Sequence, residues 1–422
     1  MPVYNGAMAE KTGKVLTAWR WYPLMAVVLA FASQGAGATA TQGLSTVYVF
    51  IQDELSLTRW QLGLITTSVF AAGTLTALPG GWALDRYSVR RVYPLMLAFM
   101  GVAFMTYSLG DAFWHILLTS AFMGCLLPVS NPAASMMVLE WAPPRMRGMA
   151  MGLKQAAVPA TGMVCAAVIP SLADALGWRP VLFGLGFVAL AVGLLVGLFY
   201  RPKPSSAIAS EDRYPFLQGL KLVALDRRML GASLVSIIMI GLFFVNVTYL
   251  ILFLRESMGF SVAVAGLGLA TFHLSSVVGR ILWGVISDGP MKGRRVPVLF
   301  IIFSLASVVL FAMAFLTPET PRVFVWVLVS GLGLTVAAFQ GLFYTHIAEV
   351  VGPALTGTAL GFNGTLLRFG PIAIPPAFGL IVDRADGDYQ VAWMVTAVLA
   401  LLALLSLRLM AGPKEVASRD GS

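Results

Sequence analysis

The chain has 422 residues, of which 58% are apolar and only 11% are Asp, Glu, Lys or Arg. Soluble domains are about 45–50% apolar and about 25% charged, so this composition excludes a soluble enzyme and a disordered tail. The net charge of +9 does not indicate a nucleic-acid partner, because basic residues beside membrane spans account for most of it. The cysteines, Cys125 and Cys165, both lie in apolar runs and give neither a disulfide framework nor metal-ligand spacing. We predict an integral membrane protein without a metal or a cofactor.

Twelve stretches are each apolar and long enough to cross a hydrocarbon core of about 30 Å as a helix. Nine contain no Asp, Glu, Lys or Arg, and the fifth, eighth and eleventh each contain one internal cation. Backbone amides cannot stay unpaired in lipid, and no alternating strands of about ten residues indicate a barrel. The predicted helices occupy residues 21–52, 60–84, 92–110, 112–139, 148–173, 181–200, 229–254, 257–287, 296–318, 323–348, 350–382 and 389–407.

Basic residues gather on one side of these predicted helices. Twenty of the 28 Lys and Arg residues fall on the side of both termini, five fall in the opposite loops, and three lie within spans. The positive-inside rule therefore predicts that both termini are cytoplasmic. We expect a multi-pass protein of the cell (inner) membrane.

One connector, residues 201–228, is longer and more polar than the others and contains Pro202 and Pro204. The sequence repeats across it with an offset of 209 positions, as Glu140, Gly148, Ala150 and Gly152 recur as Glu349, Gly357, Ala359 and Gly361. Such a repeat predicts two six-helix bundles related by an axis along the membrane normal, with a substrate near the midplane between them. We predict an N-terminal bundle over residues 1–200, a cytoplasmic linker over 201–228 and a C-terminal bundle over 229–422.

A second repeated motif ends the predicted second and eighth helices. Gly81-Trp-Ala-Leu-Asp85 is followed by Arg90-Arg91, and Gly284-Val-Ile-Ser-Asp288 is followed by Arg294-Arg295. The first copy resembles the hallmark loop of the major facilitator superfamily, and the resemblance covers nearly the whole chain. It implies an all-α membrane transporter with twelve helices in two pseudo-symmetric bundles. In that family the loop forms a cytoplasmic lock that is made in the outward-open state and broken in the inward-open state. The lock residues implied here are Asp85, Arg86, Arg90, Arg91, Asp288, Arg294 and Arg295, for which plain cytoplasmic anchoring is the alternative.

Three cations lie inside predicted spans: Lys154, Arg280 and Arg368. Charges inside a bilayer are expensive and are usually functional, yet all 19 carboxylates fall at helix ends, in loops or in tails. Arginine cannot become neutral by losing its proton, and its planar guanidinium can donate two parallel hydrogen bonds to carboxylate or phosphate oxygens. The missing partner is most simply the substrate, which predicts a cavity for a small organic anion. Lys154 is nearer the inner end, where its side chain could instead reach the membrane surface.

Polar and aromatic residues near mid-span complete the predicted substrate-binding set, although any one of them could instead join two helices by a hydrogen bond. Besides the three cations, the set contains Gln34, Asn131, Asn246, Tyr249, Gln340, Tyr344 and Asn363. His273, seven residues before Arg280, is the candidate proton carrier because imidazole titrates near neutral pH. A packing histidine is the alternative.

The segment Gly279-Arg280-Ile-Leu-Trp283-Gly284 resembles the eighth helix of the oxalate:formate antiporter branch and its monocarboxylate-transporter relatives. The resemblance implies that Arg280 binds a substrate carboxylate. The oxalate transporter has a Lys on its eleventh helix, where this chain has Arg368. The fifth-helix segment from Lys154 to Pro159 is more like other bacterial organic-anion permeases. Carboxylate transport is therefore implied, rather than oxalate transport in particular.

We predict a secondary active transporter of mono- or dicarboxylates that works by alternating access as a monomer in the lipid bilayer. Proton symport and exchange for a counter-anion both stay open, because no predicted span carries a carboxylate. A multidrug or sugar carrier of the same fold is the alternative, although such carriers typically need a deep acid. A transporter-like sensor is also an alternative, without an appended signalling domain to favour it. The three histidines are scattered, so we predict no enzyme.

Overall fold

The chain folds almost entirely into helices within residues 6–143, 146–203, 216–352 and 355–410, which the structure, a computed structural model, describes. Inside these ranges, the side chains of residues 6–20, 85, 216–217 and 408–410 lie outside the description. In chain order the elements are α1 (Gly6–Gln42), the 3₁₀ turn η1 (Leu44–Val47), α2 (Tyr48–Leu55), α3 (Arg59–Arg86), α4 (Val89–Tyr107), α5 (Phe113–Leu126), the 3₁₀ turn η2 (Leu127–Val129), α6 (Ser130–Trp141), α7 (Arg147–Leu176), α8 (Trp178–Phe199), α9 (Phe216–Leu225), α10 (Arg227–Glu256), α11 (Val262–Asp288), α12 (Arg295–Met313), α13 (Arg322–Thr335), α14 (Gln340–Val351), α15 (Thr356–Leu366), α16 (Phe369–Arg384) and α17 (Gln390–Met410).

Twelve helical stretches of the described chain are long and apolar enough to cross a membrane, which confirms the predicted all-α membrane fold. The outer helices expose apolar side chains, as Leu194 of α8 and Val285 of α11 show, both 62% exposed. Lipid tails can cover such surfaces, and the backbone polar groups of a helix form hydrogen bonds within the helix, so they do not need water. Helix α10 differs, because 94% of its most apolar stretch is buried inside the protein. It therefore lies among other helices rather than against lipid.

Four of these twelve stretches are interrupted part-way along: α1–η1–α2, α5–η2–α6, α13–α14 and α15–α16. Proline explains two of the interruptions, because it has no N–H to donate and its ring crowds the preceding turn. Pro128 lies in η2, and Pro371 follows the junction of α15 and α16. The break between α13 and α14, at residues 336–339, has no proline. It begins 209 positions after η2, at the equivalent point of the internal repeat.

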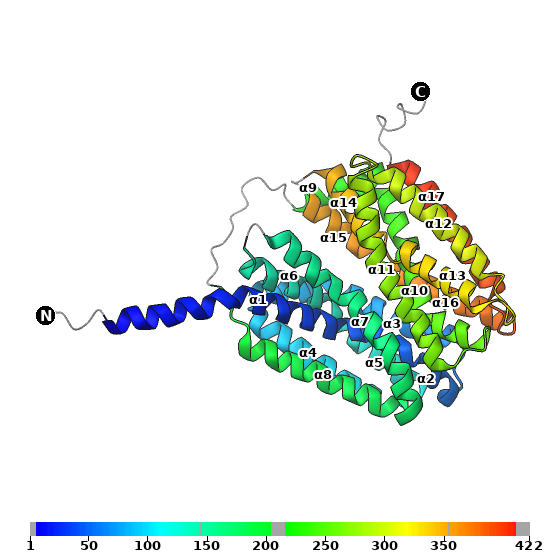
Figure 1. Cartoon of the computed structure of the whole chain (residues 1–422), viewed down its shortest axis with the longest axis horizontal. Coiled ribbons are helices and arrows are strands. Elements are labelled where there is room, and N and C mark those ends of the chain that lie inside the picture. The colour runs from blue at the N-terminus through cyan, green and yellow to red at the C-terminus, as the bar shows by residue number, and fades with distance from the viewer. Residues whose placement is uncertain (1–5, 144–145, 204–215, 353–354, 411–422) are drawn as a thin grey trace, which may run out of the picture.

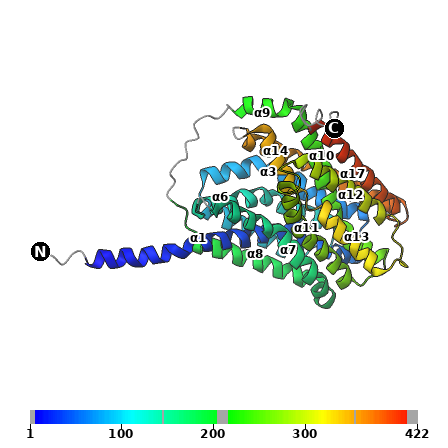
Figure 2. The same cartoon turned by 45° about the horizontal axis from the view of Figure 1, so that its top comes forward.

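Figure 1 shows α1, α4, α6 and α8 on one side of the molecule and α11, α12, α13 and α17 on the other. The two groups meet where α7 packs against α11 and α3 packs against α16. Seen from the second direction, α9 lies at the same end as α14 (Figure 2). This short helix of the long connector packs against α10 and α15.

Glycines allow the close contacts between the two groups of helices. A Cβ atom on Gly63 of α3 would lie 2.4 Å from the Cα atom of Pro376 in α16. One on Gly162 of α7 would lie 2.7 Å from the imidazole of His273 in α11. Both distances are shorter than van der Waals contact, so only glycine fits at these crossings. Small residues at helix interfaces are the usual way for backbones to come close within a membrane.

The contact between α3 and α5 provides a matched test of this packing. A Cβ atom on Gly124 would lie 2.2 Å from the carbonyl oxygen of Val69, whereas one on Gly184 would meet nothing within 4 Å. We expect Gly124→Ala to destabilise the protein by about 1–3 kcal/mol, because the two helices must separate. Gly184→Ala should leave the unfolding temperature unchanged or slightly higher, since alanine favours helix. Thermal unfolding in detergent measures both, and equal unfolding temperatures for the two variants would contradict the packing.

Candidate functional site

A cavity of about 240 Å³ lies between the two groups of helices. Residues of α1, α6 and α7 line it from one group, and residues of α10, α11 and α14 line it from the other. Among the described residues that line the cavity, Arg280 alone carries a fixed charge. No carboxylate is among these lining residues. The polar lining residues are Gln34, Thr41, Gln42, Ser130, Asn131, His273, Ser276, Arg280 and Gln340.

One face of α11 supplies three of these side chains. His273, Ser276 and Arg280 are spaced i, i+3 and i+7, which places them in a row along a helix. The hydroxyl of Ser276 donates to the carbonyl oxygen of Ala337 at 3.0 Å. Both ring nitrogens of His273 are buried without a hydrogen-bond partner. This polar row therefore keeps unused hydrogen-bonding capacity beside the cavity.

The guanidinium of Arg280 is held by neutral groups. Its Nη2 donates to Oε1 of Gln340 at 2.9 Å and to the carbonyl oxygen of Ala337 at 3.4 Å. Its Nε is buried without a partner, and no described carboxylate pairs with it. A guanidinium stays protonated, and a partly buried charge without a counterion is unfavourable. An anion in the cavity would supply the missing charge.

Lys154 lies behind the cavity wall rather than in it. The side chain is fully buried, and its Nζ donates to Oδ1 of Asn131 and, at 2.9 Å, to the hydroxyl of Ser135. Asn131 is exposed and lines the cavity, whereas Lys154 does not. This ammonium, too, has only neutral partners among the described residues. It is therefore held by α6 and does not reach toward the membrane surface.

Arg368 lies at the junction of α15 and α16, half-buried and outside the cavity lining. Its Nη1 is 2.9 Å from the position that a Cβ atom on Gly73 of α3 would occupy, so the side chain crosses to the other group of helices. Its guanidinium makes no hydrogen bond or ion pair with a described residue. The structure therefore does not bring Arg280 and Arg368 together on one cavity in this conformation.

Gln34 and Gln340 line the cavity as the sequence predicts, but four other members of the predicted substrate-binding set lie outside the lining. The amide of Asn246 donates to the carbonyl oxygen of Leu242 at 2.9 Å, within α10. The hydroxyl of Ser236 donates to Oδ1 of Asn363 at 3.0 Å and so joins α10 to α15. The bond between Ser236 and Asn363 is of the kind that holds two helices together, whereas that of Asn246 stays within one helix. The four residues are Asn246, Tyr249, Tyr344 and Asn363.

The sequence analysis missed several polar lining residues. A helical spacing could have found two of them, because Thr41 follows Gln34 by seven positions and Ser276 lies between His273 and Arg280. Gln42 and Ser130 carry no such signal. Within the described residues, no group of three or more His, Cys, Asp or Glu side chains could hold a metal ion.

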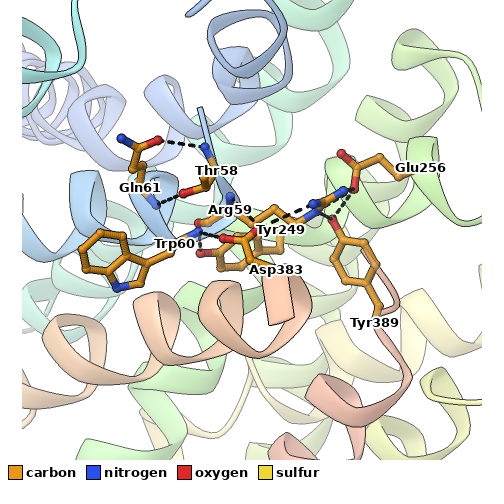
Figure 3. Close-up of polar contacts among 8 residues, drawn as sticks. All are labelled: Thr58, Arg59, Trp60, Gln61, Tyr249, Glu256, Asp383 and Tyr389. Atoms are coloured by element: carbon orange, nitrogen blue, oxygen red, sulfur yellow. Dashed lines mark hydrogen bonds and ion pairs between the residues drawn. The ribbon is translucent and has the colours of Figure 1, made fainter. Parts of the chain in front are cut away.

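A cluster around Arg59, the first residue of α3, joins the two groups of helices at one end of the molecule (Figure 3). Both carboxylate oxygens of Asp383 in α16 accept backbone N–H groups, from Arg59 at 3.1 Å and from Trp60 at 2.8 Å. The Arg59 guanidinium also pairs with Asp383 at 3.4 Å and with Glu256 of α10 at 2.9 Å. The carboxylate thus caps a helix of the other group, which favours negative charge at that terminus.

Two tyrosines complete this Arg59 cluster. The hydroxyl of Tyr249 donates to the backbone carbonyls of Arg59 at 2.8 Å and Pro375 at 3.0 Å, and that of Tyr389 donates to Glu256 at 2.6 Å. Burial, reinforced by Glu256, raises the pKa of Tyr389 well above its usual value, so the phenol stays protonated and can donate. The sequence analysis placed all carboxylates at helix ends, in loops or in tails, and did not predict that Asp383 and Glu256 meet Arg59.

Among the side chains that the structure describes, no predicted lock residue forms a hydrogen bond or an ion pair between the two groups of helices. Arg295 pairs with Asp288 and, at 3.3 Å, with Glu349, all within α11, α12 and α14. Arg90 donates to the carbonyl oxygen of Gly197 at 3.2 Å, between α4 and α8. The remaining predicted arginines, Arg86, Arg91 and Arg294, are exposed, and the side chain of Asp85 lies outside the described residues.

Twelve apolar helical stretches of the described chain, with a cavity among them that has several polar lining residues, define a multi-pass membrane protein. The sequence matches the family model described as Major Facilitator Superfamily over residues 24–375 and 246–421. The chain belongs to this family, as its loop motif predicts. The specific resemblance to the oxalate:formate branch stays a prediction.

Known relatives extend this assignment. The chain is 32% identical, over 69% of its length, to an uncharacterized MFS-type transporter from Mycobacterium tuberculosis, of whose length it spans 64%. It is 25% identical to a probable sulfoacetate transporter from Cupriavidus necator, over 86% of this chain and 88% of that one. A solved bacterial homolog of the human lysosomal transporter Spinster, in an inward-facing and occupied conformation, has the same fold. The TM-score is 0.76 at 18% identity, over 93% of this chain and 97% of that one.

Replacement of Asp383 tests whether the Arg59 cluster keeps the two groups of helices together at this end of the molecule. We expect Asp383→Asn to loosen the contact between the two groups, because it removes the charge that pairs with Arg59 and caps α3. Spin labels on exposed positions 109 and 323, in a background without Cys125 and Cys165, should then show a second, longer distance. The exposed Asp386 provides the matched control, Asp386→Asn. An unchanged distance distribution in Asp383→Asn would show that the cluster does not hold this end shut.

Proposed function

We propose that this chain is a secondary active transporter of small organic anions. The observation that carries the proposal is the guanidinium of Arg280, which lines the cavity between the two groups of helices and has no carboxylate partner among the described residues. A charged group at membrane depth is costly unless it is paired, and such groups are usually functional. A bound anion is the partner that the site lacks.

The chemistry of the lining favours carboxylates and sulfonates. Arg280 can donate to two oxygens of such a group, and the other polar lining residues are neutral hydrogen-bonding groups. Mono- and dicarboxylates of small size therefore fit the site. A relative named as a probable sulfoacetate transporter supports an organic anion as the substrate.

Alternating access is the proposed mechanism. In it, the N-terminal bundle (residues 1–200) and the C-terminal bundle (residues 229–422), joined by the linker 201–228, rock against each other around the cavity. By the positive-inside rule the termini are cytoplasmic, so the closed Arg59 cluster lies on the outer side and this conformation faces inward. Arg368 already reaches across to α3, and we propose that it meets the substrate when the bundles rearrange.

Proton symport through His273 is the coupling that we propose, with anion exchange as the competing mode. His273 is buried and lines the cavity, and neither ring nitrogen has a partner. Arg280, two helical turns away, is the one charged group that shares the lining with it. A bound anion would offset the repulsion between this guanidinium and a protonated imidazole. Proton uptake would thereby follow substrate binding.

Replacement of Arg280 tests the substrate role directly. We expect Arg280→Ala to weaken anion binding by tenfold or more, because a charge-assisted hydrogen bond contributes about 1.5–3 kcal/mol. Uptake into proteoliposomes should fall in parallel. The measurement is a thermal-shift screen of the purified protein against mono- and dicarboxylates and sulfonates, since a ligand that binds the folded state stabilises it.

Arg322→Ala is the control for Arg280→Ala, because Arg322 lies at the start of α13, where it stacks on Phe260 and does not line the cavity. It should keep the binding and uptake of the unmodified protein. Anion binding of unchanged affinity in Arg280→Ala, or stabilisation by neutral sugars alone, would refute the proposal in favour of another carrier type.

The coupling has its own test. We expect an inward proton gradient alone to drive uptake by the unmodified protein. His273→Gln should lose this proton-driven uptake and keep exchange against preloaded anion, because glutamine cannot carry a proton across. The two driving forces are compared in the same proteoliposomes. Uptake by the unmodified protein that responds only to preloaded anion would assign the transporter to exchange, and proton-driven uptake that persists in His273→Gln would refute the role of His273.

A further inference from the structure

Each wall of the cavity carries an amide whose oxygen is already engaged by a cation. Oδ1 of Asn131 accepts from Nζ of Lys154, and Oε1 of Gln340 accepts from Nη2 of Arg280. Ammonium and guanidinium groups can only donate, so each cation turns the oxygen of its amide toward itself. Both amides line the cavity, and their NH₂ groups stay available there as donors.

The two amides occupy equivalent places in the internal repeat. Gln340 follows Asn131 by 209 positions, the same offset that relates Glu349 to Glu140. Asn131 is the second residue of α6, which follows the break at η2. Gln340 is the first residue of α14, which follows the break at residues 336–339. The supporting cations are not equivalent, because Lys154 comes from α7 and Arg280 from α11. The same arrangement is thus built twice from different helices.

The contacts of Lys154 show that it acts through Asn131. The lysine is fully buried and absent from the cavity lining, whereas Asn131 is exposed there. Ser135 reinforces the arrangement, because its hydroxyl accepts from Lys154 at 2.9 Å and donates to the backbone oxygen of Asn131 at 2.8 Å. The positive charge of Lys154 is therefore separated from the cavity by the side chain of Asn131, and no carboxylate of the described residues balances it.

We propose that Lys154 is a positioning residue that fixes Asn131 as a donor to a second acid group of the substrate. The cavity then selects dianions with an acid group at each end, one held by Arg280 and the other by Asn131. A carboxylate or a sulfonate at the second end accepts from the amide and offsets the charge of Lys154. This inference rests on the proposed function and specifies the substrate class.

Two pairs of probes that differ in one acid group test the inference. Sulfoacetate is compared with isethionate, and glucarate with gluconate, by calorimetric titration of the purified full chain. The unmodified protein should bind at least one diacid tenfold or more tightly than its single-acid partner. Lys154→Met should remove this preference by weakening the diacid about tenfold or more and the single acid less than threefold.

A double-mutant cycle separates positioning from direct contact. Asn131→Ala should lose the same preference, and Lys154→Met combined with Asn131→Ala should be no weaker than the poorer single variant, because both remove one interaction. Lys221→Met, in the exposed part of α9, controls for loss of a positive charge. If Lys154→Met does not fold, as judged by size-exclusion chromatography, Asn131→Ala decides alone, because its exposed side chain is not needed for packing.

The outcomes also distinguish this inference from the proposed function. Absence of a diacid preference in both pairs, equal weakening of both partners by Lys154→Met, or additive losses in the double variant would overturn the role of Lys154. The proposed function would survive each of these results as long as some organic anion binds and Arg280→Ala weakens that binding tenfold or more. If no organic anion binds the unmodified protein, both fail together.

Discussion

A positive charge that the protein does not neutralise is the constraint on which the rest of the account depends. Lys154, Arg280 and Arg368 lie within membrane-spanning helices, and each lacks a carboxylate partner among the described residues. Arg280 and Lys154 are instead held by amide and hydroxyl oxygens. Neutral acceptors reduce the cost of such charges but do not cancel it. The cavity between the bundles is where an anion can do so.

Packing places this cavity and limits how it can open. Glycines bring α3 against α16 and α7 against α11 so closely that these crossings tolerate no side chain. At one end the Arg59 cluster adds ion pairs and a helix cap that join the bundles, and no predicted lock residue with a described side chain joins them at the other. Ion pairs and helix caps can break and re-form during a conformational change, whereas tightly packed helices move together as rigid bodies. The cluster is therefore a contact that the proposed alternating access would have to break.

The sequence predicts the twelve spans because hydrophobic length depends on no tertiary contact. It could not locate the helix breaks, since α3, α4 and α7 continue through Pro79, Pro94 and Pro159 whereas the chain breaks near Pro128 and Pro371. Counting charges identified the unpaired cations, because this requires only the position of each residue along its helix. It could not tell that Lys154 lies behind Asn131 or that Tyr249 belongs to the Arg59 cluster, because that depends on how each helix is rotated. A nearly uniform apolar sequence such as that of α10 contains little information on rotation.

A structure determined with bound sulfoacetate would test the central claim most directly. The account predicts density for an acid group within hydrogen-bonding distance of the Arg280 guanidinium, inside the cavity between the bundles. An anion bound elsewhere, with Arg280 paired to a carboxylate of the protein, would contradict it.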